Sequence, residues 1–408
     1  MILDMFSELQ KPDGMAESQL YQEAIEQAKL ADEMGFGCWW SVEHHGTGHF
    51  SYCSTPDLML TLISQHTERI HLGHSGVLAP FGIHHPMQIA ERAAFLDIVS
   101  RGRVELGLAR SLPREWENFG VDPDETREQV DAALQMIPRM WKQEPFSYEG
   151  KYLKIPERNV IPKPFPRPDG RSHPPLWVTC ANPEGFERAG RFGVGVLSTV
   201  MLSPLDHLSQ LFDHYQLGLD QCEPVGDFAN EGRAVFTFFH CAETRREAIE
   251  SGAGEAILWF MNMQHEVYSV PRDIWIASIR EKSPIWIHAG EVVEWAAADK
   301  LRKSGQIPEE EVALDFNDPV PVIALMNRQL AGHELDPVEV YEALDPFDAI
   351  IFGDVETCRR KLELHAEIGV DRLMCLMQMA PLSHETVMKS IRTTGKYLVP
   401  ELAAFERS

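Results

Sequence analysis

The strongest constraint on the fold is the regular alternation of short apolar segments with longer amphipathic segments. Short runs rich in apolar, β-branched and aromatic residues are typical of buried strands, and longer amphipathic runs are typical of surface helices. Strict alternation of the two predicts a parallel sheet. Strands are predicted at residues 2–9, 38–45, 70–79, 104–109, 175–181, 194–199, 233–242 and 371–379.

The amphipathic segments carry helix start and stop signals. Ser18 is a suitable N-cap for a helix that ends before Gly35. Pro56 stands in a first helical turn after Thr55, where its missing N–H costs nothing. Helices are predicted at residues 18–34, 56–67, 86–99, 123–142, 183–192, 204–217, 244–265 and 354–368.

Repeats of this unit predict an α/β fold, a (β/α)₈ TIM barrel formed by residues 1–408 as a single domain, with a long insertion between strands 7 and 8. The insertion covers residues 250–350. The alternative is a doubly wound open sheet, which would be expected to carry G-x-G-x-x-G after its first strand. Residues 9–18 contain no such motif, so the barrel is favoured.

The formal net charge of −25 argues against nucleic acid and membrane surfaces as partners, because both are anionic. Much of the excess lies in one stretch, residues 304–356, which contains 13 acidic residues and one basic residue, Arg328. The insertion is therefore acidic. It also carries Trp259, Phe260 and Met263, which predict either an apolar wall of the active site or ordinary helix packing.

The cysteines indicate a reducing compartment. The chain has seven of them, widely spaced and without a C-x-x-C pair, which is typical of free thiols. The N-terminal segment lacks the basic and apolar regions of a signal peptide, and no run of about 20 apolar residues predicts a membrane span. We therefore expect a cytoplasmic protein without membrane contact.

Polar residues cluster where predicted strands end, and in a (β/α)₈ barrel those ends carry the active site. The second strand ends with Glu43, His44 and His45, and His49 follows. Adjacent strand residues point to opposite faces, so His44 and His45 cannot easily share an ion and no metal site is expected. One imidazole is instead predicted to line the pocket as an acid, a base or a hydrogen-bond donor, unless it is purely structural.

A second group of residues predicts an anion site. Arg110 follows the fourth strand, and residues 180–185 lead from the fifth strand into a helix. Free N–H groups at a helix N-terminus, here those of Asn182 and Gly185, suit a phosphate, and Arg110 would add a charge-assisted hydrogen bond. The alternative is that Arg110 forms an ordinary surface pair with a carboxylate.

Several motifs occur together and in order: EHH within residues 30–45, RGRVELGLAR at 101–110, WVTCANPEG at 177–185 and FGDVETCRRKLELHAEIGVDRLM at 352–374. In this combination the sequence resembles the bacterial luciferase-like family of flavin-dependent monooxygenases. The resemblance extends over most of the chain. Residues 250–350 match poorly, and in this family that region is variable and bears on the substrate.

The resemblance implies a barrel that holds reduced FMN at the carboxyl ends of its strands. His44 matches the essential histidine of the family, which supports the C4a-oxygen adduct of the flavin and proton transfer, and Glu43 precedes it at the flavin site. Ser75 and Gly76 match a non-proline cis peptide beside the flavin ring. Ala109 departs from the pattern, because luciferase itself has a reactive cysteine there.

The phosphate of FMN would be held, by the same resemblance, by Arg110 and by the backbone around Ala181, Asn182 and Gly185. The resemblance also implies a homodimer packed through the early helices, with Glu91 and the 86–99 helix near the interface. From the residues alone, Ala94, Phe95 and Ile98 of that helix face either a partner or the barrel.

The predicted function is therefore that of an FMN-dependent two-component monooxygenase. A separate flavin reductase would supply reduced FMN, and O₂ would oxidise a small apolar organic substrate through a C4a-peroxyflavin. Two alternatives remain at this point: a deazaflavin-dependent dehydrogenase, which shares this barrel, and a non-catalytic partner subunit of a heterodimer.

Overall fold

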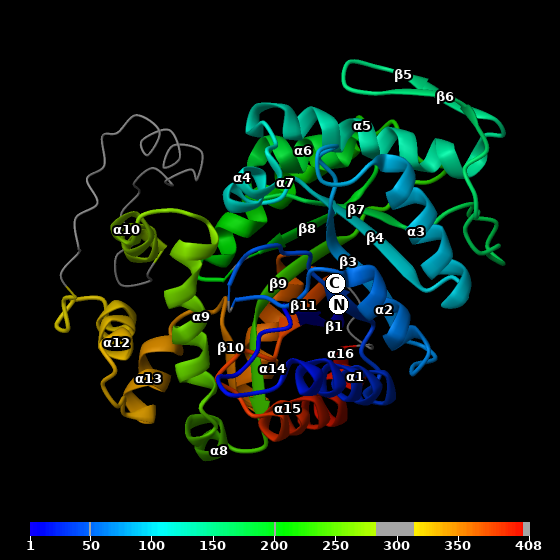
Figure 1. Ribbon diagram of the computed structural model, residues 1–408. Helices are drawn as coiled ribbons and strands as arrows, with labels where there is room; N and C mark the ends of the chain where they lie inside the picture. Colours follow the sequence, from blue (N-terminus) through cyan, green and yellow to red (C-terminus); the bar gives the residue numbers. More distant parts are fainter. Residues whose placement is uncertain (49, 200, 283–313, 403–408) are drawn as a thin grey trace.

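The computed structural model describes residues 1–408 except 49, 200, 283–313 and 403–408 (Figure 1). Its centre is a closed barrel in which each strand pairs in parallel with the next and β11 pairs with β1. The predicted (β/α)₈ fold is confirmed. The barrel strands are β1 (Ile2–Ser7), β2 (Cys38–Ser41), β3 (His71–Leu78), β4 (Val104–Ala109), β7 (Leu176–Thr179), β8 (Gly195–Thr199), β9 (Arg233–Ala242) and β11 (Arg372–Leu376).

The strands are apolar on both faces because both faces are covered. Every residue of β2 and of β4 is buried, as expected for a parallel sheet surrounded by helices. Strand β1 closes the barrel between β2 and β11: Met5 lies opposite Trp39 of β2 on one side and Cys375 of β11 on the other. An ion pair is enclosed in this core, since Asp4 accepts hydrogen bonds from Arg372 Nε at 2.7 Å and from Trp40 Nε1 at 2.8 Å.

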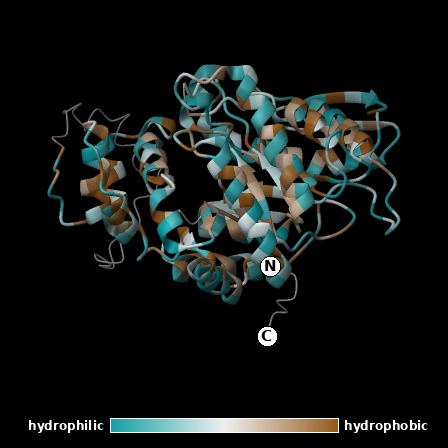
Figure 2. Ribbon diagram, turned by 90° about the horizontal axis from the view of Figure 1, so that it is seen from below, coloured by the Kyte–Doolittle hydropathy of each residue, from teal (hydrophilic) through white to brown (hydrophobic). Residues whose placement is uncertain are grey.

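Helices surround the barrel, and in Figure 2 they carry both apolar and polar segments, as expected for helices buried on one side. The prediction that the first helix ends before Gly35 is confirmed, and Gly35 is left-handed (φ 83°). Ser18 is not the N-cap of this helix, because the helix begins at Glu17 and its N-cap is Ala16. The surrounding helices are α1 (Glu17–Met34), α2 (Pro56–Ser64), α3 (Pro86–Val99), α5 (Pro123–Lys142), α6 (Pro183–Arg191), α7 (Leu205–Leu219), α14 (Val355–Glu367) and α15 (His384–Tyr397).

Apart from helices of the insertion, which are described below, several elements were not predicted from the sequence. The predicted helix 244–265 is in fact two, α8 (Arg245–Glu250) and α9 (Ala253–Val267), because Gly252 between them is left-handed (φ 79°). The other unpredicted elements are α4 (Pro113–Phe119), α15, α16 (Val399–Leu402), the antiparallel hairpin β5 (Phe146–Glu149) and β6 (Lys154–Arg158), and a ninth strand of the main sheet, β10 (Ile351–Asp354). The strand β10 lies outside the barrel and pairs with the second half of β9, whose first half pairs with β11.

The insertion between β9 and β11 is largely helical where it is described. It contains α9, α10 (Arg272–Lys282), α12 (Pro321–Leu330) and α13 (Pro337–Leu344), which gather on one side of the barrel in Figure 1. Asn262 of α9 donates hydrogen bonds to Met326 O and Gln329 Oε1, which ties α9 to α12. Residues 283–313 of the predicted insertion lie outside the described residues.

Two further features concern the cysteines and the length of the apolar helices. All seven cysteines are free thiols in the structure, as the sequence predicted. Among the described residues, we find no helix that combines the length and the apolar character needed to cross a membrane.

Candidate active site

A cavity of about 340 Å³ opens at the carboxyl ends of the barrel strands. Its lining is contributed by the barrel strands and the segments that follow them, and by the helices α4, α5, α6 and α9. The structure brings all the predicted site residues together in this lining: Glu43, His44, Ser75, Gly76, Arg110, Ala181, Asn182 and Gly185. The strand ends that the sequence singled out therefore form one site.

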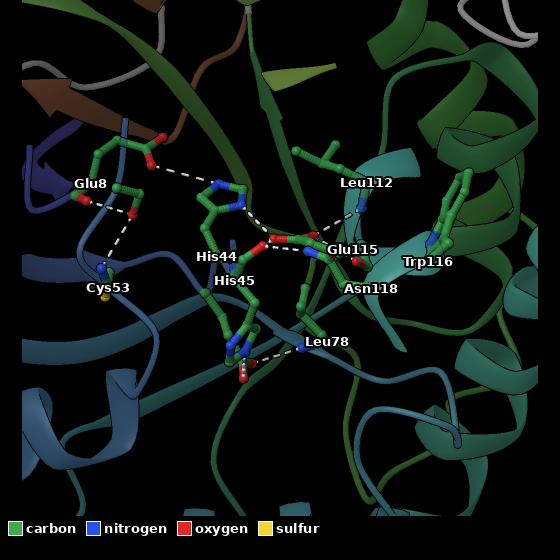
Figure 3. A network of polar contacts seen from close by, with 12 residues as sticks. Glu8, His44, His45, Cys53, Leu78, Leu112, Glu115, Trp116 and Asn118 are labelled. Atoms are coloured by element: carbon green, nitrogen blue, oxygen red, sulfur yellow. Dashed lines mark hydrogen bonds and ion pairs between the residues drawn. The ribbon is translucent and has the colours of Figure 1, made fainter. Parts of the chain in front are cut away.

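His44 lies between two buried carboxylates (Figure 3). Its Nδ1 is 2.9 Å from Glu115 Oε1, and its Nε2 is 3.6 Å from Glu8 Oε2. Burial disfavours the charged imidazolium, but the hydrogen bond to Glu115 and the charge of Glu8 outweigh burial and raise the pKa of His44 to about 9. Near neutral pH this imidazole is therefore protonated and able to donate a proton.

Glu115 was missed by the sequence analysis, although its environment makes it a positioning residue for His44. Its carboxylate is fully buried and also accepts hydrogen bonds from Ser111 Oγ at 2.6 Å and from the backbone N–H of Leu112 and His45 at 3.0 Å. The signal that was available is the start of α4, where Pro113 at the first position and Glu at the third are typical of a capped helix. Nothing in that signal indicated contact with His44.

Glu8 was also missed, because the first strand was treated only as core. It follows β1, its side chain is almost fully buried, and it lines the cavity. Burial raises the pKa of Glu8 to about 7, with the charge of His44 acting in the opposite direction. Its carboxyl is thus partly ionised at neutral pH.

Glu43 lines the cavity, but its carboxylate is fully engaged by the protein. Its Oε1 lies 3.2 Å from His45 Nε2 and 2.5 Å from His84 Nε2, and its Oε2 accepts the backbone N–H of Leu78. Burial would raise the pKa of Glu43, yet these hydrogen bonds lower it to about 2. Glu43 therefore fixes the loop after β2, and a direct role in cofactor binding stays a prediction.

Glu43 and its two histidine partners also matter for the prediction that the chain has no metal site. Glu43, His45 and His84 offer ligand atoms within 4.8 Å of one another, a grouping that the sequence did not reveal because His84 comes from a distant segment. Hydrogen bonds between the two imidazoles and one carboxylate already explain this grouping. The absence of a metal stays a prediction, and His49 lies outside the described residues.

Three guanidinium groups that line the same cavity lie close enough for their charges to interact, those of Arg110, Arg127 and Arg188. Arg110 donates to Thr126 Oγ1 at 3.0 Å and to Pro123 O at 3.2 Å, and Arg188 pairs with Asp131 at 3.1 Å. Burial, followed by the charges of Arg127 and Arg188, lowers the pKa of Arg110. The predicted alternative of an ordinary Arg110–carboxylate pair is thus replaced by a cationic cluster.

The helix N-terminus near this cluster differs from expectation in one respect. Asn182 is the N-cap of α6, and its side-chain oxygen accepts the N–H of Gly185 at 2.9 Å. The prediction that the Gly185 N–H is free for a phosphate is therefore wrong, because the N-cap side chain already satisfies it. Asn182, Ala181 and Gly185 nevertheless line the cavity.

The peptide Ser75–Gly76 also lines the cavity, and it is cis, as the resemblance implied. A side chain at Gly76 has no space, because its Cβ would lie 2.8 Å from the backbone of Gly107 on the neighbouring strand. The chain therefore requires glycine here for close packing of β3 on β4.

An aromatic wall lines the remaining part of the cavity. It consists of Phe6, Phe50, Phe236 and Phe260, whose ring centroids lie 4.5 to 6.1 Å apart from pair to pair. Phe260 belongs to α9, so the insertion contributes a wall of the site. Trp259 and Met263, which were considered with it, are not among the lining residues and pack against the core.

Curated proteins of known activity are similar to part of this chain. The oxygenase component of flavin-dependent trigonelline monooxygenase from Acinetobacter baylyi is 28% identical over 239 residues, covering 58% of this chain and 63% of that protein. Limonene 1,2-monooxygenase from Rhodococcus erythropolis is 26% identical over 261 residues, covering 62% of this chain and 63% of that protein. The chain thus matches less than two thirds of the length of either relative.

Solved structures share the fold over nearly the whole chain. Monooxygenase RslO1 from Streptomyces bottropensis has a TM-score of 0.69 at 21% identity, covering 98% of this chain and 100% of that one. The oxygenating constituent of 3,6-diketocamphane monooxygenase from Pseudomonas putida, in complex with FMN, has a TM-score of 0.68 at 20% identity, covering 98% of each chain. The coenzyme F420-dependent tetrahydromethanopterin reductase from Methanopyrus kandleri has 0.63 at 19%, covering 98% and 99%.

The family model described as luciferase-like monooxygenase matches residues 2–372, which is most of the chain. Every residue that lines the cavity lies within this match except Met374 of β11. The chain therefore belongs to the luciferase-like monooxygenase family.

Proposed function

We propose that this chain is the oxygenase component of a two-component FMN-dependent monooxygenase, which receives reduced FMN from a separate flavin reductase and uses O₂ to oxidise a small organic substrate. One observation carries the proposal. A single cavity is lined by a cationic cluster, a protonated imidazole and an aromatic wall.

The cationic cluster fits the phosphate of FMN. Arg110, Arg127 and Arg188 line the same cavity, and Asp131 balances only part of their charge. Burial lowers the pKa of Arg110 most, and repulsion from Arg127 and Arg188 lowers it further. A phosphate dianion would relieve that repulsion, and guanidinium groups bind phosphate oxygens in a bidentate manner. Asn182 and Ala181 line the cavity beside this cluster and would bound the phosphate site.

The imidazole and the aromatic wall supply proton transfer and exclude water. Reduced FMN, when bound, provides the electrons with which O₂ is activated. His44, which is held by Glu115 and protonated at neutral pH, would supply a proton during the oxidation of the substrate. The phenylalanine wall keeps water from the site, which limits wasteful side reactions.

A deazaflavin-dependent dehydrogenase is the second candidate, because a structural neighbour acts with coenzyme F420. The presence of FMN in another neighbour and the named activities of the curated relatives favour the monooxygenase. A non-catalytic partner subunit is disfavoured, since the whole site is assembled within this chain.

A homodimer is part of the proposal. Four apolar side chains are exposed on the neighbouring helices α2 and α3: Leu58 and Leu62, 65% and 50% exposed, and Phe95 and Ile98, 50% and 39% exposed. Ala94 is buried against the barrel, so only part of the α3 surface considered from the sequence is available. Light scattering should give twice the chain mass. The cytoplasmic location stays a prediction.

Anaerobic titration of reduced FMN tests the cofactor assignment. The wild-type chain should bind one equivalent, and Arg110→Ala should weaken binding by roughly 10- to 100-fold, as expected for a lost charge-assisted contact. Arg246→Ala on the outer surface, with a side chain that is 84% exposed, is the matched control. Equal affinities of the two variants, or binding of reduced deazaflavin in preference to reduced FMN, would contradict the proposal.

A further inference from the structure

The aromatic part of the cavity is not uniformly apolar. Glu8 and Gln264 line it together with the four phenylalanines, and their side chains are 6% and 2% exposed. Gln264 Nε2 has no hydrogen-bond partner within the part of the chain that the structure describes, and Glu8 Oε2 has none there beyond its 3.6 Å ion pair with His44 Nε2. A buried polar atom without a partner costs free energy, which a ligand with the complementary group would recover.

The two groups are complementary in kind. A carboxylate oxygen accepts a hydrogen bond, whereas the amide nitrogen of Gln264 donates one. A hydroxyl group can do both at once, donating to one partner and accepting from another. The rings of Phe6, Phe50, Phe236 and Phe260 form a surface suited to a planar ring.

We propose, on the basis of the function proposed above, that the substrate is a hydroxylated aromatic compound whose ring packs on the phenylalanine wall, whose hydroxyl donates to Glu8, and which offers an acceptor atom to Gln264. This refines the apolar substrate predicted from the sequence. It also makes Glu8 and Gln264 the residues that determine specificity.

The charges around Glu8 indicate whether the ligand group that donates to it is neutral or cationic. Carboxylates with aromatic rings also suit ammonium groups. Here, however, His44 Nε2 is already 3.6 Å from Glu8 Oε2 and supplies the positive charge. A second cation beside the imidazolium would be repelled, so a neutral hydroxyl is the better partner. At pH 8, between the pKa of Glu8 (about 7) and that of His44 (about 9), both groups are charged.

Anaerobic calorimetry at pH 8 on the chain saturated with reduced FMN tests this inference. The probes are p-cresol, 4-fluorotoluene, which has a similar shape without a donor, and benzylamine, which is cationic. The wild type should bind p-cresol about 10-fold more tightly than 4-fluorotoluene, as expected for one hydrogen bond to a charged acceptor. Benzylamine should bind more weakly than p-cresol.

Variants assign the preference to Glu8. Glu8→Leu should reduce the preference for p-cresol to less than about 2-fold, because no acceptor remains. Glu8→Gln, which keeps an acceptor oxygen, should show an intermediate preference and guards against a folding defect of the leucine variant. Glu367→Gln, on the exposed side of α14, is the control and should keep the wild-type preference.

The outcomes are distinct. Equal binding of p-cresol and 4-fluorotoluene to the reduced-FMN complex, or tighter binding of benzylamine, would overturn the substrate assignment alone. A wild-type preference that survives in Glu8→Leu would overturn the role of Glu8. Failure of the wild type to bind reduced FMN would overturn the proposed function, and the inference with it.

Discussion

Replacing Glu115 with glutamine removes the negative charge beside His44 and should therefore lower the pKa of His44. The folded chain raises the pKa of His44 from 6.5 to about 9, which corresponds to roughly 3 kcal/mol in favour of the imidazolium. Burial acts against the charge, and the hydrogen bond that Glu115 Oε1 accepts from His44 Nδ1 at 2.9 Å is the largest contribution in its favour. Without the Glu115 charge, burial is opposed only by the charges of Glu8 and Glu43, so the pKa of His44 should fall from about 9 toward neutrality.

The assay is the pH dependence of His44 ionisation, measured by NMR on ring-labelled protein and by turnover of reduced FMN with a bound phenol. Glu115→Gln should move the basic limb from near pH 9 to near pH 7, so that turnover at pH 8 falls by roughly 10-fold or more while activity at pH 6 changes less. A purely structural role would lower activity equally at all pH values. An unchanged limb near pH 9 in a folded variant would refute the positioning role of Glu115.

Other predictions concern stability and are checked by equilibrium unfolding in denaturant. Arg372→Met should cost about 3–5 kcal/mol, because it leaves the carboxylate of Asp4 buried without its partner; a loss below about 1 kcal/mol would contradict this. Gly107→Ala should cost at least about 1–3 kcal/mol, since its Cβ would lie 2.2 Å from the carbonyl oxygen of His74; wild-type stability would refute the packing argument. Because folding raises the pKa of Glu8 from 4.5 to about 7, the folded state holds its proton more tightly, so stability from this group should fall as pH rises between those values. Glu8→Gln should lack that fall, and a parallel pH profile would contradict it.

The barrel could be predicted because its strands are buried on both faces, which makes them continuous apolar runs that contrast with amphipathic helices. Short elements carry too little pattern for this. The strand β10 has only four residues, Ile351–Asp354, and its partner is the second half of an unusually long β9. The break at Gly252 was missed because one glycine in an apolar stretch is compatible with a continuous helix.

The site was predictable in position but not in its contacts. His44 and Arg110 stand at strand ends, so the barrel topology places them in one cavity. Glu8 and Glu115 reach His44 from segments 36 and 71 residues away, respectively, and no local spacing indicates such a contact. The capping of Gly185 by Asn182 also depends on backbone geometry that residue types alone do not determine.

The central claim is that this chain binds reduced FMN and controls its reaction with oxygen. The most direct test is stopped-flow reoxidation of reduced FMN by O₂ in the presence of excess chain, compared with free reduced FMN and with the chain carrying His44→Ala. We expect the reoxidation trace with the wild-type chain to differ from that of free reduced FMN. We also expect the trace with His44→Ala to differ from that with the wild-type chain. Identical traces with and without the wild-type chain would contradict the central claim.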